Sequence, residues 1–281
     1  MRAIDRVGEW PVDHVSAATV VIDPSGRATV GTAGDQELRY RIASIAKTIT
    51  AWATFVAVEE GLLALDTAIG QPGCTLRHLL SHAGGYPFDG PRPIAAPGRR
   101  RIYSNTGIEM AADAVADAAA MPFGQYLSEA VLEPLGMAAT ELRGSPAHAM
   151  WSSCHDLARF TMETMRPTLI GSEMADAAVR PAFPDLRGIV PGIGRYERCS
   201  WGLGFEIKGD KVPHWTGARN SPQTFGHFGG ASTFVWVDLG AAHDRAVACM
   251  ALTDRPFDDW AEQALALWPA FSDAVLVEAR G

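Results

Sequence analysis

The stretch SIAKTITAWATFVAVEE, residues 44–60, contains no glycine or proline and is apolar on nearly every side. Gly61 follows it, and glycine commonly ends a helix. The stretch therefore predicts a buried helix that begins near Ser44. Ser44 and Lys47 stand three residues apart at its start, so one helical turn places both side chains on the same face.

A serine and a lysine that meet in this way can form a nucleophile and its base. A serine hydroxyl is a weak nucleophile until a neighbour accepts its proton, and a desolvated lysine can be neutral. The helix N-terminus adds a positive field that favours the developing alkoxide. Only Lys47, Lys208 and Lys211 are lysines among 24 basic residues, and lysine gives up a proton far more readily than arginine. The alternative is that Ser44 only caps the helix, because Ser-x-x-Lys alone is a weak motif.

The second candidate motif is Tyr103-Ser104-Asn105, just before a helix expected over Thr106–Ala120. The pattern is uncommon by chance because the chain has five tyrosines and only two asparagines. Tyr103 can carry a proton beside Lys47, and the amide of Asn105 can hold both Lys47 and a substrate carbonyl. The alternative is a tyrosine that packs on the core and an asparagine that caps the next helix.

The third candidate motif is His227-Phe228-Gly229-Gly230, which leads into an apolar run. An edge strand beside the nucleophile can offer a backbone N–H to a tetrahedral oxyanion, and glycines permit the substrate to approach closely. We expect the N–H groups of Ser44 and Gly230 to be these donors. His82-Ala83-Gly84 has the same His-x-Gly pattern, and we interpret it as a coincidental match in a loop that ends a helix.

The three motifs, in this order and with these separations, resemble the active-site motifs of serine β-lactamases, DD-peptidases and β-lactamase-like (family VIII) esterases. Further stretches across nearly the whole chain look like the same family: Arg41–Ser44, Arg77–His82, Glu133–Met137, Ser153–Phe160 and Trp201–Phe205. The resemblance implies a β-lactamase/transpeptidase-like fold of the α/β (α+β) class. Such a fold has an antiparallel sheet flanked by helices, a mostly helical lobe, and the active site in the cleft between them.

The resemblance also implies roles for the motif residues. Ser44 would be the nucleophile that forms an acyl-enzyme, and Lys47 and Tyr103 would exchange its proton. The residues expected to bind the substrate or the oxyanion are Asn105, His227, Gly229 and Gly230. His227 would support Tyr103 or the leaving group. No metal and no cofactor is implied.

The third motif departs from the pattern of β-lactamases and DD-peptidases, which typically carry Lys-Thr-Gly there to hold a substrate carboxylate. His227 and Phe228 occupy those places, and a neutral imidazole and a phenyl ring make a poor carboxylate site. Family VIII esterases are similar in using His-x-Gly, so we expect a carboxylesterase that acts on small acyl esters. The alternatives are an amidase or D-aminopeptidase, an acyltransferase, a DD-peptidase or β-lactamase, and a sensing module that is acylated without turnover.

The expected order of elements begins with a hairpin over residues 15–31, followed by the helix at 44–60. Helical patches are expected at Leu76–Ser81, Thr106–Ala120, Phe123–Glu133, Ser153–Met165 and Ser172–Val179. Strands are expected at Trp201–Lys208, Thr224–His227, Thr233–Asp238 and Arg245–Thr253, before a last helix at Asp258–Leu267. We interpret residues 1–281 as a single catalytic domain, with a sheet lobe of about 1–64 and 196–281 and a helical lobe of about 65–195.

Composition excludes several classes of partner. A formal net charge of −8 and the absence of a Lys/Arg block argue against a nucleic-acid groove or a polybasic membrane surface, and Arg99–Arg101 is expected in a solvated loop. The first ten residues contain no apolar stretch typical of export, so we expect a cytoplasmic protein. The scattered positions of Cys74, Cys154, Cys199 and Cys249 favour buried, reduced thiols. The expected partner is a small ester or amide substrate.

Overall fold

A six-stranded antiparallel sheet forms the centre of the computed structural model, which describes residues 2–242 and 244–280. The strand order is β2-β1-β11-β10-β9-β8, so strands from both ends of the chain lie side by side. The strands are β1 Val15–Ile22, β2 Ala28–Ala33, β8 Glu206–Ile207, β9 Phe225–Gly229, β10 Thr233–Ala242 and β11 Arg245–Thr253. The predicted antiparallel sheet is thus confirmed.

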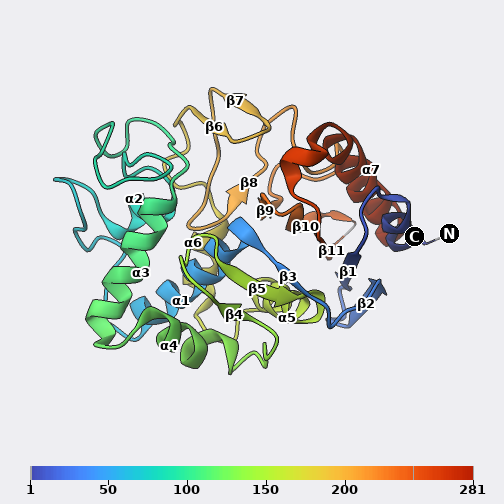
Figure 1. Ribbon diagram of the computed structural model, residues 1–281, viewed down its shortest axis with the longest axis horizontal. Coiled ribbons are helices and arrows are strands. Elements are labelled where there is room, and N and C mark those ends of the chain that lie inside the picture. Colours follow the sequence, from blue (N-terminus) through green and yellow to red (C-terminus); the bar gives the residue numbers. More distant parts are fainter. Residues whose placement is uncertain (1, 243, 281) are drawn as a thin grey trace.

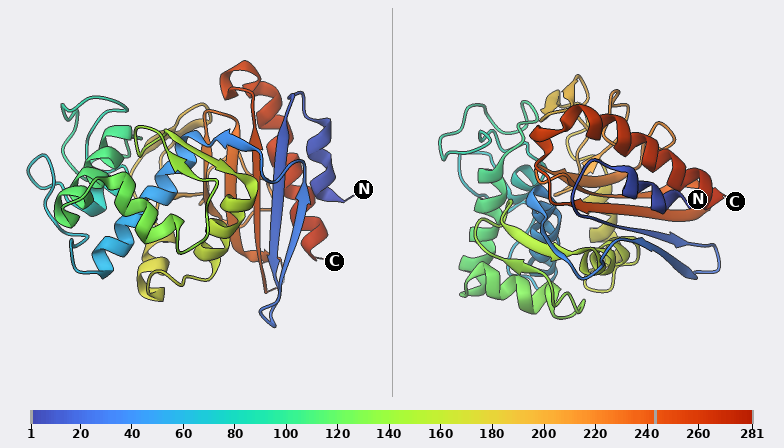
Figure 2. Two further views of the ribbon diagram at one scale, coloured as in Figure 1. Left: turned by 60° about the horizontal axis from the view of Figure 1, so that its bottom comes forward. Right: turned by 45° about the vertical axis from the view of Figure 1, so that its right-hand side comes forward.

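The two faces of this sheet bury different helices because successive side chains along a strand point to opposite sides. In β1, Ala18 and Val20 belong to the larger core cluster, which contains most of the helices, whereas Ala17 faces helix α7, Ala261–Arg280. Figure 2 shows α7 and the N-terminal turn Ala3–Glu9 together on one side of the sheet. Both faces are therefore covered, as expected for an antiparallel sheet flanked by helices.

The remaining helices come from the middle of the chain (Figure 1). They are α1 Ala46–Glu59, α2 Leu76–Leu80, α3 Asn105–Ala119, α4 Phe123–Leu127, α5 Cys154–Met165 and α6 Ser172–Val179, with a π-helical turn at Ser128–Leu132 and a 3₁₀ turn at Ala43–Ile45. A further 3₁₀ turn, Phe257–Asp259, precedes α7. A small three-stranded sheet and a hairpin complete the fold: β3 Arg39–Arg41, β4 Glu141–Leu142 and β5 Met150–Ser153, then β6 Gly188–Val190 and β7 Gly194–Tyr196.

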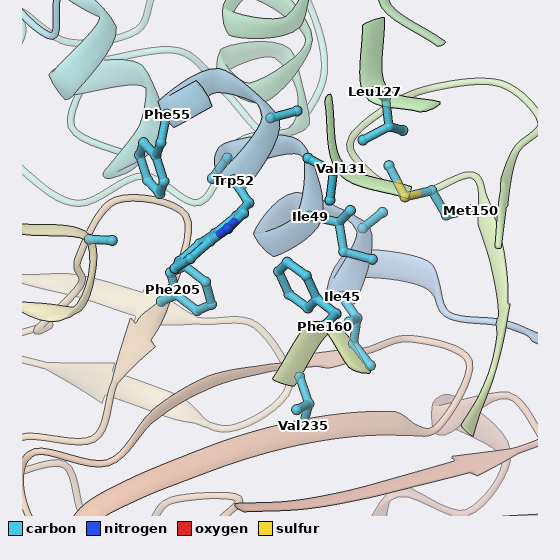
Figure 3. Packing of buried hydrophobic residues seen from close by; sticks show 14 of the residues in the cluster. Ile45, Ile49, Trp52, Phe55, Leu127, Val131, Met150, Phe160, Phe205 and Val235 are labelled. Carbon is cyan, nitrogen blue, oxygen red and sulfur yellow. The ribbon is translucent and has the colours of Figure 1, made fainter. Parts of the chain in front are cut away.

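Helix α1 lies in the middle of the larger core cluster (Figure 3). Its Trp52 is fully buried and makes edge-on ring contacts with Phe160 of α5 and with Phe205, at centroid separations of 6.0 and 6.1 Å. The indole N–H of Trp52 donates to Glu163 at 3.2 Å. Packing on every side fixes α1 in place, so the residues at its N-terminus are held rigidly against the sheet.

The structure differs from the sequence prediction at several boundaries. The last helix continues to Arg280 with Pro269 inside it, because its apolar face follows the sheet beyond Leu267. The strand predicted over Trp201–Lys208 is reduced to Glu206–Ile207, with Trp201 in an isolated bridge. The five short strands β3–β7 were not predicted, since each is too short to show a period-two pattern.

Two other expectations concern burial and extent. All four cysteines are buried and free, as predicted. No helix among residues 2–242 and 244–280 is long and apolar enough to cross a membrane. The expected domain of residues 1–281 includes Met1, His243 and Gly281, which lie outside the described residues, and its division into two lobes stays a prediction.

Candidate active site

Ser44 lies in the 3₁₀ turn that leads into α1, and the backbone of this turn is unusual. Ala43, the residue before it, has φ of +46°, in the left-handed region that non-glycine residues seldom adopt. The turn is held from the sheet side, where the Thr233 hydroxyl donates to the carbonyl of Ile42 at 3.0 Å. These contacts fix the position of the partly exposed Ser44 side chain.

The end of β9 packs directly on the same turn. A Cβ atom at Gly229 would lie 2.5 Å from the carbonyl oxygen of Ile42 and 3.0 Å from Cβ of Ala43, so only glycine fits. At Gly230 a Cβ atom would meet no heavy atom within 4 Å, so the backbone there faces open space. Gly229 of the predicted third motif thus packs on the turn that carries Ser44, and Gly230 follows it with open space where a side chain would be.

Lys47 is fully buried one turn into the helix, and its Nζ lies 3.1 Å from Oγ of Ser44. Its other hydrogen-bond partner is the carbonyl oxygen of Ala147, at 2.9 Å. Burial lowers the pKa of Lys47 from 10.5 to about 7, although Glu109 and Asp89 partly oppose the shift. A neutral amine that donates to Ala147 has its lone pair free to accept the proton of Ser44, which is the geometry of a base.

The carbonyl that holds Lys47 comes from a loop anchored by two helices. Thr50 of α1 donates to the carbonyl of Pro146 at 2.8 Å, and Ser145 donates to the carboxylate of Glu109 on α3. This partner of Lys47 could not be predicted from the sequence. The Ala147 carbonyl is a backbone group 100 residues away from Lys47, so no side-chain motif predicts this contact.

Tyr103 lies against both Lys47 and His227. The ammonium nitrogen of Lys47 is 4.8 Å from the centroid of the tyrosine ring, and the Tyr103 hydroxyl is 3.4 Å from Nε2 of His227. Burial raises the pKa of Tyr103 well above 10, although a hydrogen bond with Ser44 partly opposes the shift. Tyr103 is therefore protonated at neutral pH and can serve as a proton donor.

His227 is neutral, and its tautomer follows from its partners. Its Nδ1 is 2.6 Å from the backbone carbonyl of Phe228, which can only accept, so Nδ1 carries the proton and Nε2 is an acceptor for Tyr103. Burial, with the nearby charge of Lys47, lowers the pKa of His227 to about 4. The structure thus places His227 beside Tyr103, as predicted.

Asn105 stands at the start of α3 but its amide is used differently from the expectation. Its Nδ2 donates to the carboxylate of Asp89 at 3.0 Å, and its buried Oδ1 has no hydrogen-bond partner in the described chain. The expected hydrogen bond between Asn105 and Lys47 is absent because Ala147 and Ser44 take the lysine. The side-chain oxygen of Asn105 is therefore a buried hydrogen-bond acceptor without a partner among the described residues.

His82 belongs to the site, although its His-x-Gly pattern was interpreted as a coincidental match. Its ring centroid lies 4.7 Å from that of Tyr103 and 4.9 Å from that of Trp201, and its Nδ1 accepts the backbone N–H of Ser104 at 3.2 Å. Burial lowers the pKa of His82 well below 6.5, so the ring is neutral. The loop position was predicted correctly, but the contact with Tyr103 was not.

Arg101 also differs from the expectation for residues Arg99–Arg101, because it is buried rather than solvated. Its guanidinium donates to the carbonyl groups of Ser81, Ala182, Phe183 and Cys199. These bonds tie the segment before Tyr103 to three other segments, at the end of α2, before β6 and after β7. Burial lowers the pKa of Arg101 to about 10, so the side chain stays charged at neutral pH.

Comparison with known families decides the class of the protein. The Beta-lactamase family model matches residues 15–270, which is most of the chain. The chain belongs to the Beta-lactamase family. It is therefore a member of a family of serine hydrolases that act on small-molecule substrates, as its three motifs predicted.

Two solved structures and one curated relative illustrate this similarity. A β-lactamase structure (Mb2281c) from Mycobacterium bovis is 45% identical over 99% of this chain and 100% of that chain, with a TM-score of 0.91. A simvastatin synthase (LovD9 mutant) from Aspergillus terreus is 18% identical over 98% and 97%, with a TM-score of 0.78, and shows the fold alone. The D-alanyl-D-alanine-carboxypeptidase/endopeptidase AmpH of Escherichia coli (strain K12) is 28% identical over 143 residues, only 38% of this chain and 37% of AmpH.

Proposed function

We propose that the protein is a carboxylesterase that forms an acyl-enzyme on Ser44 and releases the acyl group to water. One observation supports this most strongly. Lys47 is fully buried without an ion-pair partner among the described residues, lies 3.1 Å from Ser44 Oγ and has a pKa near 7. Such a lysine is partly neutral at physiological pH and can accept the serine proton.

In the proposed acylation step, Ser44 Oγ forms a bond to the ester carbonyl carbon while its proton passes to Lys47. The oxyanion would lie between the N–H groups of Ser44 and Gly230, where the backbone faces open space. The C–O bond to the alcohol then breaks. Tyr103 donates its proton to the leaving oxygen and recovers one from Lys47, so the alcohol departs neutral.

Deacylation repeats the sequence with water as the nucleophile. Water loses a proton to Lys47 as its oxygen bonds to the acyl carbon, and Ser44 regains a proton from Tyr103 as it leaves. Tyr103 then recovers a proton from Lys47, which restores the resting enzyme. His227, which accepts from Tyr103 through Nε2, would hold the phenol in place during both steps. His227 and Phe228 provide no cation at the third motif, which supports neutral esters over substrates with a carboxylate bound there.

Amide hydrolysis is the second candidate. The Oδ1 atom of Asn105 is a buried acceptor without a partner, and Asp89 fixes the amide in that orientation. An acceptor suits a substrate N–H better than a carbonyl. The carboxypeptidase name of the curated relative AmpH agrees with this candidate.

The test is the intact mass of the protein after incubation with p-nitrophenyl butyrate, with released nitrophenol followed in parallel. Wild type should gain one butyryl group and continue to turn over. Ser44→Ala should lose both, whereas the control variant Ser25→Ala in the β1–β2 turn should behave as wild type.

Other outcomes would contradict the proposal in distinct ways. An adduct without continuing turnover would indicate a sensing module. No adduct and unchanged Ser44→Ala behaviour would exclude Ser44 as the nucleophile. A higher kcat/KM for butyryl p-nitroanilide than for the ester would favour the amidase.

A further inference from the structure

A pocket of about 760 Å³ opens beside Tyr103, a size typical of small-molecule sites. Tyr103 is one of its lining residues, so the pocket adjoins the proposed proton donor. Phe88 stacks on the Tyr103 ring at a centroid distance of 5.8 Å and also lines the pocket. A group bound here would therefore lie against Tyr103.

The pocket is apolar over part of its wall. Phe88, Ile94 and Ile189 line it, and they are 50%, 54% and 47% exposed. Large hydrophobic side chains that stay this exposed around one hollow favour an apolar ligand, because a ligand would remove their surface from water.

The rest of the wall is cationic. Arg100, Arg101, Arg187 and Arg195 line the pocket together with a single acidic residue, Glu197. This concentration of positive charge stands out in a chain whose formal net charge is −8. Clustered positive charge around a hollow raises the local concentration of anions.

Three of these arginines have guanidinium groups that nothing in the described chain occupies. No hydrogen bond or ion pair engages the side chains of Arg100, Arg187 and Arg195 within residues 2–242 and 244–280. Arg101 differs, because four backbone carbonyls hold it, so it contributes charge but no free donor. Unpaired guanidinium groups on an apolar wall suit a carboxylate, which accepts two parallel N–H bonds from one arginine.

Backbone hydrogen bonds hold the segments of the chain that carry the pocket arginines. Ile189 and Arg195 are direct cross-strand partners in the β6–β7 hairpin, so an apolar and a cationic side chain stand together on one face. The backbone N–H of Arg101 donates to the carbonyl of Arg187 at 2.9 Å, and Arg101 bridges to Gly188. The hairpin is therefore tied to the segment that leads into Tyr103.

We propose that this pocket binds a carboxylate-bearing, apolar leaving group of the ester substrate. This proposal rests on the proposed function, because Tyr103 identifies the leaving-group side only if it protonates the departing oxygen. The third motif lacks a cation for a carboxylate, and the pocket arginines supply one at a different place. The substrate class is thus an acyl ester of an alcohol that carries an apolar body and an anionic end.

The test compares kcat/KM for two matched esters, 3-(butanoyloxy)benzoate and the neutral 3-(butanoyloxy)benzamide. Wild type should prefer the carboxylate by about tenfold, which corresponds to about 1.4 kcal/mol. The preference should fall as salt is added, because the arginines are exposed. In Arg187→Gln/Arg195→Gln the ratio should approach one, because kcat/KM for the benzoate falls.

Arg27→Gln is the matched control, since Arg27 follows the β1–β2 turn at the opposite edge of the sheet from β8. It removes one positive charge and should leave the ratio unchanged. A wild-type ratio at or below one, or a ratio that the double variant does not lower, would overturn the proposal.

Binding to Ser44→Ala separates this proposal from the proposed function. Calorimetry with 3-(butanoyloxy)benzoate should show binding to Ser44→Ala that the added arginine substitutions weaken about tenfold. If wild type hydrolyses neither ester but this binding pattern holds, the proposed function fails together with the leaving-group role, and only the assignment of the pocket as a carboxylate-binding site stands. If both esters are hydrolysed without arginine-dependent binding, the pocket assignment fails alone.

Discussion

The protein buries two lysines completely, and the two have opposite surroundings. Lys47 has no carboxylate within ion-pair distance among the described residues, and its partners are a hydroxyl and a backbone carbonyl. Lys211 lies 3.3 Å from the carboxylate of Glu206, which is equally buried, and also donates to the carbonyls of Ser200 and Ile207. The first lysine can lose its proton near neutral pH, whereas the second is paired with a buried carboxylate.

The cluster around Lys211 is fully paired. Glu206 also accepts from Nε2 of His214 at 3.3 Å and from the indole N–H of Trp215 at 2.8 Å. Burial alone would raise the pKa of Glu206, but Lys211 and these donors outweigh it and lower the pKa to about 2. A buried charge that is satisfied in this way supports structure. A buried lysine that is left unpaired is available for chemistry.

Replacement of Lys47, the lysine without a carboxylate partner, is expected to have the largest effect on activity, and it tests the contrast between the two lysines. Lys47→Met should lower kcat/KM for p-nitrophenyl butyrate by about 10⁴-fold, because Lys47 is the base that contacts Ser44 Oγ in the described part of the chain. It should also raise the free energy of unfolding by about 1–2 kcal/mol at pH 6, measured by urea denaturation.

The sign of that stability change follows from the pKa of Lys47. The pKa is about 7 in the folded state against 10.5 ordinarily, so folding opposes protonation. The resulting destabilisation is complete below pH 7 and disappears as pH rises towards 10.5, so the gain from methionine should shrink over that window. An active Lys47→Met, or one that is less stable at pH 6, would contradict the contrast between the two lysines.

Replacing the paired lysine should damage stability instead. Lys211→Met leaves the buried Glu206 carboxylate without its lysine partner, and we expect the free energy of unfolding to fall by about 3–5 kcal/mol. The double variant Lys211→Met/Glu206→Gln should recover most of this loss, and the folded fraction should keep kcat/KM within about threefold. Loss of activity at unchanged stability would place this pair in the catalytic machinery.

Tyr103→Phe tests the role of Tyr103 as the proton donor, and it is expected to lower kcat/KM less than Lys47→Met does. Phenylalanine keeps the ring contacts with His82 and Trp201 but removes the hydroxyl, so kcat/KM for ethyl butyrate should fall by about 10²–10³-fold. The fall should be smaller for p-nitrophenyl butyrate, because nitrophenolate leaves readily without a proton. An equal fall for both esters would argue against proton donation to the leaving group.

Local spacing predicted the parts of the site that lie close together in the sequence. Ser44 and Lys47 meet because they are one helical turn apart, and Tyr103 reaches them from the start of the next long helix in the site, α3. Long-range backbone partners could not be predicted. The Ala147 carbonyl that holds Lys47 and the four carbonyls that bury Arg101 carry no side-chain signature, because any residue supplies a carbonyl.

The predictions for His82 and Arg101 were wrong for another reason: the same residue type, in a similar local sequence, can lie in the site or on the surface. His82 and His227 share a His-x-Gly pattern, and both lie against Tyr103, since the fold brings the end of α2 and strand β9 to the same ring. Arg101 ends a run of three arginines whose first two members are exposed, and composition alone does not separate it from them. These environments depend on contacts between residues far apart in the sequence, 81 residues for Arg101 with Ala182 and 124 residues for Tyr103 with His227.

The most direct test of the central claim is the pH dependence of kcat/KM for p-nitrophenyl butyrate from about pH 5.5 to about pH 9. His227, with a pKa of about 4, and Tyr103, whose pKa is raised above 10, do not titrate in this range, whereas Lys47 does. We predict a rise of about tenfold per pH unit at low pH that levels off above a midpoint near 7. A flat profile, or a rise that continues to the top of the range without a midpoint, would contradict the account of Lys47 as the base that activates Ser44.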